Sequence, residues 1–411
     1  MKKSQAKLTN FVILFASVLI MATTMGIVTV VSSIFYPVVS ESLGVSRASF
    51  ALTGTITSLS SMVAALFWGN FYAKKPLAKP MVIGVIVFGL AVLGMSFARN
   101  IYQFYFLSLL VGLTYGGISI IPVSIMITRH FSKNTGFALS TALAGSGLGA
   151  MILNPIINNL ISGGTWQPGY RLIVICVFAL TLPSAFLATR LTKDAVQAKS
   201  LEQSQESKLE IQNPQKSTWF WAFLLAAFLT GVTGGAVLSN LPTYLKDLNF
   251  AVSQISIITA AYSASLVFGK FVLGGLYDRM GAMIGTLTSA LLMSLCLGVM
   301  VFIQSPPVLI LMLISIGIGM AIGTVSVTWL TNYFFGKANY SKYYGSVQFA
   351  NSFGIAAGVP VIAAALENLA QPSQIWLILT VVSLLMTGLF VFSIRGNRKA
   401  KAAQIAAAIG E

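Results

Sequence analysis

Two charged residues in the second half of the chain could take part in ligand binding. Lys270 lies within a long apolar stretch, and Asp278 follows it by eight residues. A charge inside an apolar span is costly and needs a compensating partner, so a lysine there marks a functional position. Eight residues correspond to roughly 12 Å along a helix. The pattern therefore predicts an anion-binding lysine within a helix and a carboxylate near the end of that helix.

The composition of the chain predicts a membrane protein. Of 411 residues, 56% are hydrophobic and only 8% are charged, whereas a soluble domain has about 25% charged residues. Apolar runs that approach or exceed the roughly 20 residues needed to cross a bilayer recur throughout. Cys176 and Cys296 fall inside such runs, where packing is expected rather than a disulfide or metal pair. The expected spans are residues 9–38, 50–72, 80–98, 101–128, 135–162, 169–190, 217–245, 253–277, 281–303, 306–335, 343–366 and 373–394.

A polar stretch near the middle of the chain divides these twelve spans into six and six. It contains Gln, Ser, Glu and Lys without apolar periodicity, which is typical of a flexible linker. We therefore expect an all-α membrane protein with twelve transmembrane helices in two six-helix, pseudo-symmetric bundles. The expected parts are the N-terminal bundle 1–191, the cytoplasmic linker 192–216, the C-terminal bundle 217–394 and the cytoplasmic tail 395–411.

The basic residues predict the orientation of the chain. Most of the 25 Lys and Arg residues lie on one side if the N-terminus is cytoplasmic, and basic residues in short loops stay on the cytoplasmic side. The residues expected on the opposite side are Arg47, Arg99, Arg171 and Lys246. Both termini are thus predicted to be cytoplasmic, in a bacterial plasma membrane. The net charge of +16 is spread over many loops, which favours contact with membrane lipid and not with nucleic acid.

Glycines repeat between the two halves. Three in the fifth span and three in the eleventh share one mutual spacing: Gly136, Gly145 and Gly149, and Gly345, Gly354 and Gly358. A pair four residues apart occurs in the fourth span and again in the tenth: Gly112 with Gly116, and Gly319 with Gly323. Small residues at this spacing let two helix backbones approach closely. We expect these glycines to form helix-crossing faces.

The segment around the two charged residues, 269–281, reads GKFVLGGLYDRMG. It resembles the cytoplasmic loop signature of the major facilitator superfamily, and the whole chain resembles members of that family. The resemblance implies that Asp278, with Gly274 and Arg279, holds an inward gate shut. A carboxylate beside an arginine or a helix N-terminus is favoured and can be released when helices part. The first half has Ala73 where the acid would stand, which leaves Asp278 as the main gate candidate.

Several other stretches resemble the oxalate/formate exchanger and monocarboxylate transporter branch of that superfamily. They are residues 33–37 with 43–47, residues 130–139 with 144–149, and Trp166 with Tyr170 and Arg171. In that branch the position of Lys270 carries a base that contacts the substrate carboxylate. The resemblance implies a transporter of a small organic anion, above all a monocarboxylate, by antiport or with a coupling ion. Lys270 could instead extend to the membrane interface or serve the gate.

The charges that the chain lacks narrow the expected substrate. Oxalate/formate exchangers carry a second cation in the eleventh span, where this chain offers neutral amides, and one cation suits one negative charge. Proton-coupled carriers place an acid one turn before the base, where this chain has Leu266. Neutral polar residues must complete the site, although each could instead form an interhelical hydrogen bond. The candidates are Tyr115, Asn240, Trp329, Gln348 and Asn351.

Two rival functions share these features in part. A multidrug exporter of the same fold would present a wide aromatic cavity and would not need Lys270. A membrane receptor would usually add a soluble signalling segment, and the polar linker is short for one. No Gly-rich loop followed by Lys and Ser or Thr occurs, which argues against ATP-driven transport. We expect a transporter and not an enzyme, with a small-molecule substrate, a possible counter-substrate or coupling ion, no metal and no cofactor.

Overall fold

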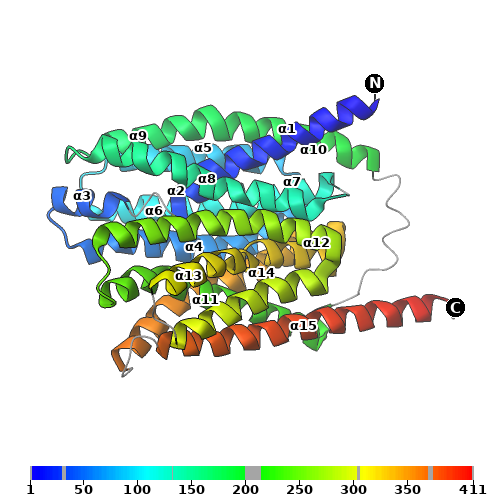
Figure 1. Ribbon diagram of the computed structural model, residues 1–411. Coiled ribbons are helices and arrows are strands. Elements are labelled where there is room, and N and C mark those ends of the chain that lie inside the picture. The colour runs from blue at the N-terminus through cyan, green and yellow to red at the C-terminus, as the bar shows by residue number, and fades with distance from the viewer. Residues whose placement is uncertain are drawn as a thin grey trace. The chain divides into compact units, whose positions relative to one another are not determined.

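The computed structural model describes residues 2–29, 34–131, 133–199, 214–302, 306–368 and 374–409. This part of the chain is helical and contains no strand (Figure 1). It divides into two compact units, called here the first unit and the second unit. The first comprises Met1–Glu202 and Asn339–Gly345, and the second comprises Gln203–Ala338 and Ser346–Glu411.

The helices follow one another with short connections. Those of the first unit are α1 (Lys2–Thr23), α2 (Met25–Thr29), α3 (Phe35–Ser42), α4 (Arg47–Lys74), α5 (Ala78–Met95), α6 (Ile101–Ile118), α7 (Ile120–His130), α8 (Thr135–Ile161), α9 (Gln167–Cys176), the π-helical turn η2 (Val177–Thr181) and α10 (Leu182–Lys199). The later ones are the 3₁₀ turn η4 (Pro214–Lys216), α11 (Thr218–Asp247), α12 (Val252–Phe302), α13 (Pro306–Gly319), the 3₁₀ turn η5 (Met320–Gly323), α14 (Val325–Asn368) and α15 (Gln374–Ile409).

Within the described ranges, ten helical segments are long and apolar enough to cross a membrane. Two of them contain a non-helical glycine, Gly281 in α12 and Gly336 in α14, each with a positive φ that favours glycine. A straight helix of 51 residues, the length of α12, would extend about 77 Å, more than twice the hydrocarbon thickness. Each of these segments therefore supplies two passes, which agrees with the twelve expected. We number the passes in chain order.

Several passes of the first unit are interrupted near their middle. The first breaks at Thr24, between α1 and α2, and the fourth breaks at Ser119, where φ is −103° and ψ is −121°. The sixth contains the π-helical turn η2. The Thr23 and Thr181 hydroxyls join the first break to this turn through a hydrogen bond of 2.5 Å. Such interruptions often mark functional places in a helix.

The expected glycine crossings are confirmed in both units. In the first unit α8 lies on α1, and a Cβ atom added to Gly149 would be 2.5 Å from Ala22 Cα. In the second unit α14 lies on α11, and a Cβ atom added to Gly358 would be 2.8 Å from Val232 Cα. Only glycine permits backbones this close. The core of each unit is therefore built around one such crossing.

The expected match between the fourth and tenth passes is wrong by two residues. Gly112 lies against Ser60 and the Thr57 carbonyl, and the equivalent contact in the second unit is made by Gly317 against Ser265. Gly319 instead faces Met293. A spacing of four recurs in both passes, but the neighbouring helix decides which glycine is used.

Helices continue beyond two of the expected boundaries. α10 runs to Lys199, so the first residues of the expected linker are helical, and η4 occupies its last three residues. α15 runs to Ile409, so the expected tail is largely a continuation of the last pass. Residues 200–213 of the expected linker lie outside the described residues.

Candidate functional site

Lys270 is buried on α12, with 4% of its surface exposed, and it is the one charged side chain buried to this degree in the described part of the chain. The residue before it, Gly269, lies against the backbone of α13: an added Cβ atom would be 2.6 Å from Ile318 Cα. This contact holds the turn that carries Lys270 directly against the tenth pass. The depth of the lysine is thus set by backbone packing. A cation at this depth can pair with an anion that has left water.

An aromatic stack lies two turns further along α12. Tyr277, on the same side of the helix as Lys270 by spacing, stacks on Trp329 of α14 with ring centroids 4.6 Å apart. Trp329 stacks in turn on Tyr333, at 5.6 Å. The hydroxyl of Tyr277 also hydrogen-bonds Thr286, at 2.8 Å, across the Gly281 turn. This stack, called here the aromatic column, ties the eighth, ninth and tenth passes together.

The end of α15 contacts the aromatic column. Arg398 Nε donates a hydrogen bond of 3.2 Å to the Tyr333 hydroxyl. Lys401 Nζ donates one of 2.8 Å to the Tyr333 carbonyl and lies 5.1 Å from the centre of its ring. Trp329 therefore participates in a structural stack at one end of the helix, two turns from Lys270.

The expected gate residues surround the turn between the eighth and ninth passes. Gly281 has φ +76°, a conformation that side chains disfavour, and so provides the turn that the loop signature requires. Gly274 is buried, Asp278 is half-buried and Arg279 is exposed. The carboxylate therefore lies where it can contact neighbouring helix ends, while the arginine faces outward.

The two expected amides of the eleventh pass have different surroundings. Asn351 is buried, and its amide donates a hydrogen bond of 3.0 Å to the Ala227 carbonyl of α11. This is the interhelical bond that we weighed against substrate contact, and it belongs to the glycine crossing of α14 on α11. Gln348 is half-buried and donates to the Ser352 hydroxyl at 3.2 Å, within its own helix.

The remaining substrate candidates lie elsewhere. Tyr115 belongs to the first unit, is half-buried, and has a side-chain hydrogen bond to Ser119, the residue at which the fourth pass breaks. Asn240 lies in α11, and its side chain falls outside the described residues. Lys270, Trp329, Gln348 and Asn351 belong to the second unit.

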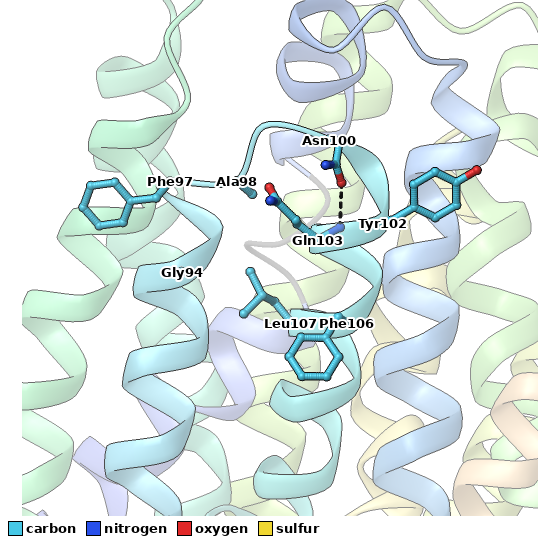
Figure 2. A pocket seen from close by; sticks show the side chains of 8 residues that line it. All are labelled: Gly94, Phe97, Ala98, Asn100, Tyr102, Gln103, Phe106 and Leu107. Atoms are coloured by element: carbon cyan, nitrogen blue, oxygen red, sulfur yellow. Dashed lines mark hydrogen bonds between the residues drawn. The ribbon is translucent and has the colours of Figure 1, made fainter.

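A shallow pocket of about 560 Å³ lies where α5 and α6 meet. Figure 2 shows the side chains that line it, among them Phe97, Tyr102 and Phe106, with the Asn100 side chain accepting a hydrogen bond from the Gln103 amide. These three aromatic side chains are exposed, as is usual for rings at a membrane interface. None of the lining residues is charged, so the pocket does not extend the lysine site.

Sequence reasoning missed the partners of Trp329. The spacing of four between Trp329 and Tyr333 was visible as one helix face, and Tyr277 directly precedes Asp278. The contact between α12 and α14, and the arrival of Arg398 and Lys401 from α15, depend on the tertiary structure.

Relatives with similar sequences are named for drug resistance. The chain is 25% identical over 281 residues to the multidrug resistance protein MdtG of Citrobacter koseri, which covers 66% of this chain and 68% of that protein. It is 26% identical over 286 residues to the protein of the same name from Escherichia coli O9:H4, with the same coverage. These names differ from the oxalate/formate and monocarboxylate branch, so that part of the expected resemblance is not supported by them.

Solved structures share the fold. The human organic anion transporter MFSD10 (TETRAN) has a TM-score of 0.67 at 13% identity, over 94% of this chain and 99% of that one. The E. coli fucose:proton symporter FucP has a TM-score of 0.69 at 13% identity, over 94% and 98%. At this identity the likeness concerns the fold alone.

A family model covers most of the sequence. The model described as Major Facilitator Superfamily matches residues 14–359 and also residues 223–408. The overlap of the two matches agrees with the internal repeat seen in the glycine crossings. The all-helical architecture, the two units and the family match have one explanation: this chain is a multi-pass membrane transporter that belongs to the major facilitator superfamily.

Proposed function

We propose that the chain moves a small organic anion across a bacterial plasma membrane by alternating access between its two bundles, with both termini in the cytoplasm. The observation that carries this proposal is the burial of Lys270 inside the eighth pass. An anion that enters a low-dielectric cavity needs a compensating cation, and a lysine at this depth supplies one. One cation suits a substrate with a single carboxylate.

The proposed roles of the other residues follow from their contacts. Tyr115 and Gln348 are half-buried and can offer hydrogen bonds to the rest of the substrate. Asn351 and Trp329 support the site by holding helices together. Asp278, with Gly274 and Arg279, serves as the latch at the turn between the eighth and ninth passes. Transport then requires that this latch opens and closes.

The test measures binding by purified protein that carries Lys270→Gln. Lactate, formate, oxalate and a cationic dye are compared by calorimetry, and uptake of the same compounds is followed in proteoliposomes. Loss of one partner of a buried pair costs about 3–5 kcal/mol, so the affinity for the preferred monocarboxylate should fall on the order of a hundredfold or more. Lys270→Arg should retain part of the binding because it keeps the charge but changes the geometry.

Lys246→Gln is the matched control, because Lys246 is an exposed lysine of the same unit. It should bind the anion like the wild type. Wild-type affinity in Lys270→Gln would remove the lysine from the substrate site, and an altered turnover with unchanged affinity would assign it to the gate instead.

Drug export is the second candidate function, and the names of the relatives from Citrobacter koseri and E. coli favour it. In that case the cationic dye would be transported, and Lys270→Gln would leave its transport unchanged. The same set of compounds thus separates the two candidates.

A further inference from the structure

A cavity of about 750 Å³ lies in the second unit, between the start of α11 and the end of α15. Three cations line it: Lys216 from η4, and Arg395 and Lys399 from α15. All three are exposed. None of the residues that line the cavity is acidic. The cavity therefore concentrates positive charge at one end of a membrane-spanning bundle.

The positions of the two α15 cations strengthen this concentration. Arg395 and Lys399 are four residues apart and lie on one face of the helix, where two like charges repel each other. A negatively charged group between them removes that repulsion. The charge of the cavity is thus complementary to an anion such as a phosphate group.

The other end of the cavity is apolar and open. Gly388 and Phe392 precede Arg395 on the same face of α15, at spacings of four and three residues. A Cβ atom added to Gly388 would meet nothing within 4 Å, and Phe392 is 51% exposed. The cavity continues here into a lipid-facing helix surface, on which Leu384 and Leu385 are also exposed. One helix face therefore passes from apolar to cationic over about three turns.

Trp219 forms the wall between these two ends. It is 4% exposed, and its indole N–H has no hydrogen-bond partner in the part of the chain that the structure describes. Gly396 brings α15 against it: an added Cβ atom would be 2.7 Å from Trp219 Cβ. A buried indole N–H usually finds an acceptor, and a polar headgroup in the cavity would offer one after a small side-chain shift.

We propose that this cavity binds one anionic phospholipid, with its phosphate between Lys216, Arg395 and Lys399 and one acyl chain in the groove at Gly388 and Phe392. Basic pockets between membrane helices are suited to anionic headgroups. The joined apolar groove distinguishes a lipid from a free phosphate ion. The proposal is independent of the substrate that the chain transports.

The test uses the full-length protein in detergent and titrates it with phosphatidylglycerol, phosphatidylcholine or inorganic phosphate. Native mass spectrometry counts bound lipid, and the melting temperature reports stabilisation. The wild type should retain one phosphatidylglycerol in preference to phosphatidylcholine. The triple variant Lys216→Gln, Arg395→Gln, Lys399→Gln should lose affinity for phosphatidylglycerol on the order of 10- to 100-fold.

A matched control removes three exposed cations from the first unit, by Lys74→Gln, Lys75→Gln and Lys79→Gln. It should bind phosphatidylglycerol like the wild type, because the same charge is lost away from the cavity. Equal losses in both triple variants would show that only overall charge matters and would overturn the proposal.

Gly388→Leu tests the acyl groove without changing any charge. The open space at Gly388 accepts the side chain, so the protein should fold, and the leucine should weaken phosphatidylglycerol binding by occupying the groove. Stabilisation by inorganic phosphate equal to that by phosphatidylglycerol, or full lipid binding by Gly388→Leu, would contradict a lipid site.

Discussion

The second and eighth passes share their packing. Ser60 lies beside Gly112 in the first unit, and Ser265 lies beside Gly317 in the second. Both pairs are 205 residues apart in sequence (265 − 60 and 317 − 112). The contact between neighbouring helices thus defines which residues of the two halves correspond. It is a better guide than glycine spacing, which matched the tenth pass two residues too late.

The same two passes differ in their charges. With this correspondence Ala65 is the counterpart of Lys270, and Ala73 is the counterpart of Asp278. Both halves need close helix crossings, so packing residues occur twice. A carrier with one substrate anion needs one cation, and the charged residues occur once. The comparison teaches that the duplicated positions maintain the fold, while the positions that differ are the candidates for function.

The glycine crossings should give the largest effects on stability, and equal ones in the two units. Gly149→Ala and Gly358→Ala each place a methyl group against a neighbouring backbone. We expect each to lower the free energy of unfolding by about 1–3 kcal/mol, because neither backbone can yield without separating the helices. Thermal unfolding in detergent measures this loss.

Gly275→Ala is the control for these variants, since an added Cβ atom there would meet nothing within 4 Å. Its melting temperature should equal or exceed that of the wild type. Sensitivity in one unit only would break the equivalence of the two crossings.

The acid of the eighth pass should have a smaller effect, confined to function. Asp278→Asn should lower transport by roughly tenfold, which corresponds to the loss of about 1.4 kcal/mol from one charged contact. Its amount in the membrane should stay normal, because the residue is half-buried at a helix end. Ala73→Asp places an acid at the counterpart position, which is exposed, and should change transport little. Unchanged flux in Asp278→Asn would remove the latch from the mechanism.

The smallest expected effect concerns the aromatic contacts. Tyr72 in the first unit stacks on Trp68 of its own helix, at 5.4 Å, whereas Tyr277 stacks on Trp329 of another helix. Trp68→Leu and Trp329→Leu should each lose about 0.5–1.5 kcal/mol of stacking. Only Trp329→Leu should also slow transport, because its stack joins three passes. Equal slowing in both variants would argue that the second-unit stack has no special part in movement.

The sequence alone predicted the class, the number of passes and the helix crossings. Long apolar runs can cross a bilayer only as helices, since the backbone must satisfy its own hydrogen bonds there. Gly145 and Gly354 were recognised as crossing residues because a missing side chain has one main use inside a membrane helix. Lys270 stood out for the same kind of local reason: a charge in an apolar run is rare and costly.

Other features were decided by the tertiary structure. Asn351 forms an interhelical bond to Ala227 because α14 crosses α11 there, and its amide alone did not distinguish this from substrate contact. Trp329 meets Tyr277 because the Gly281 turn and the packing of α12 bring two distant segments together. Sequence spacing specifies the faces of one helix, whereas the partner of each face depends on how helices far apart in the chain pack.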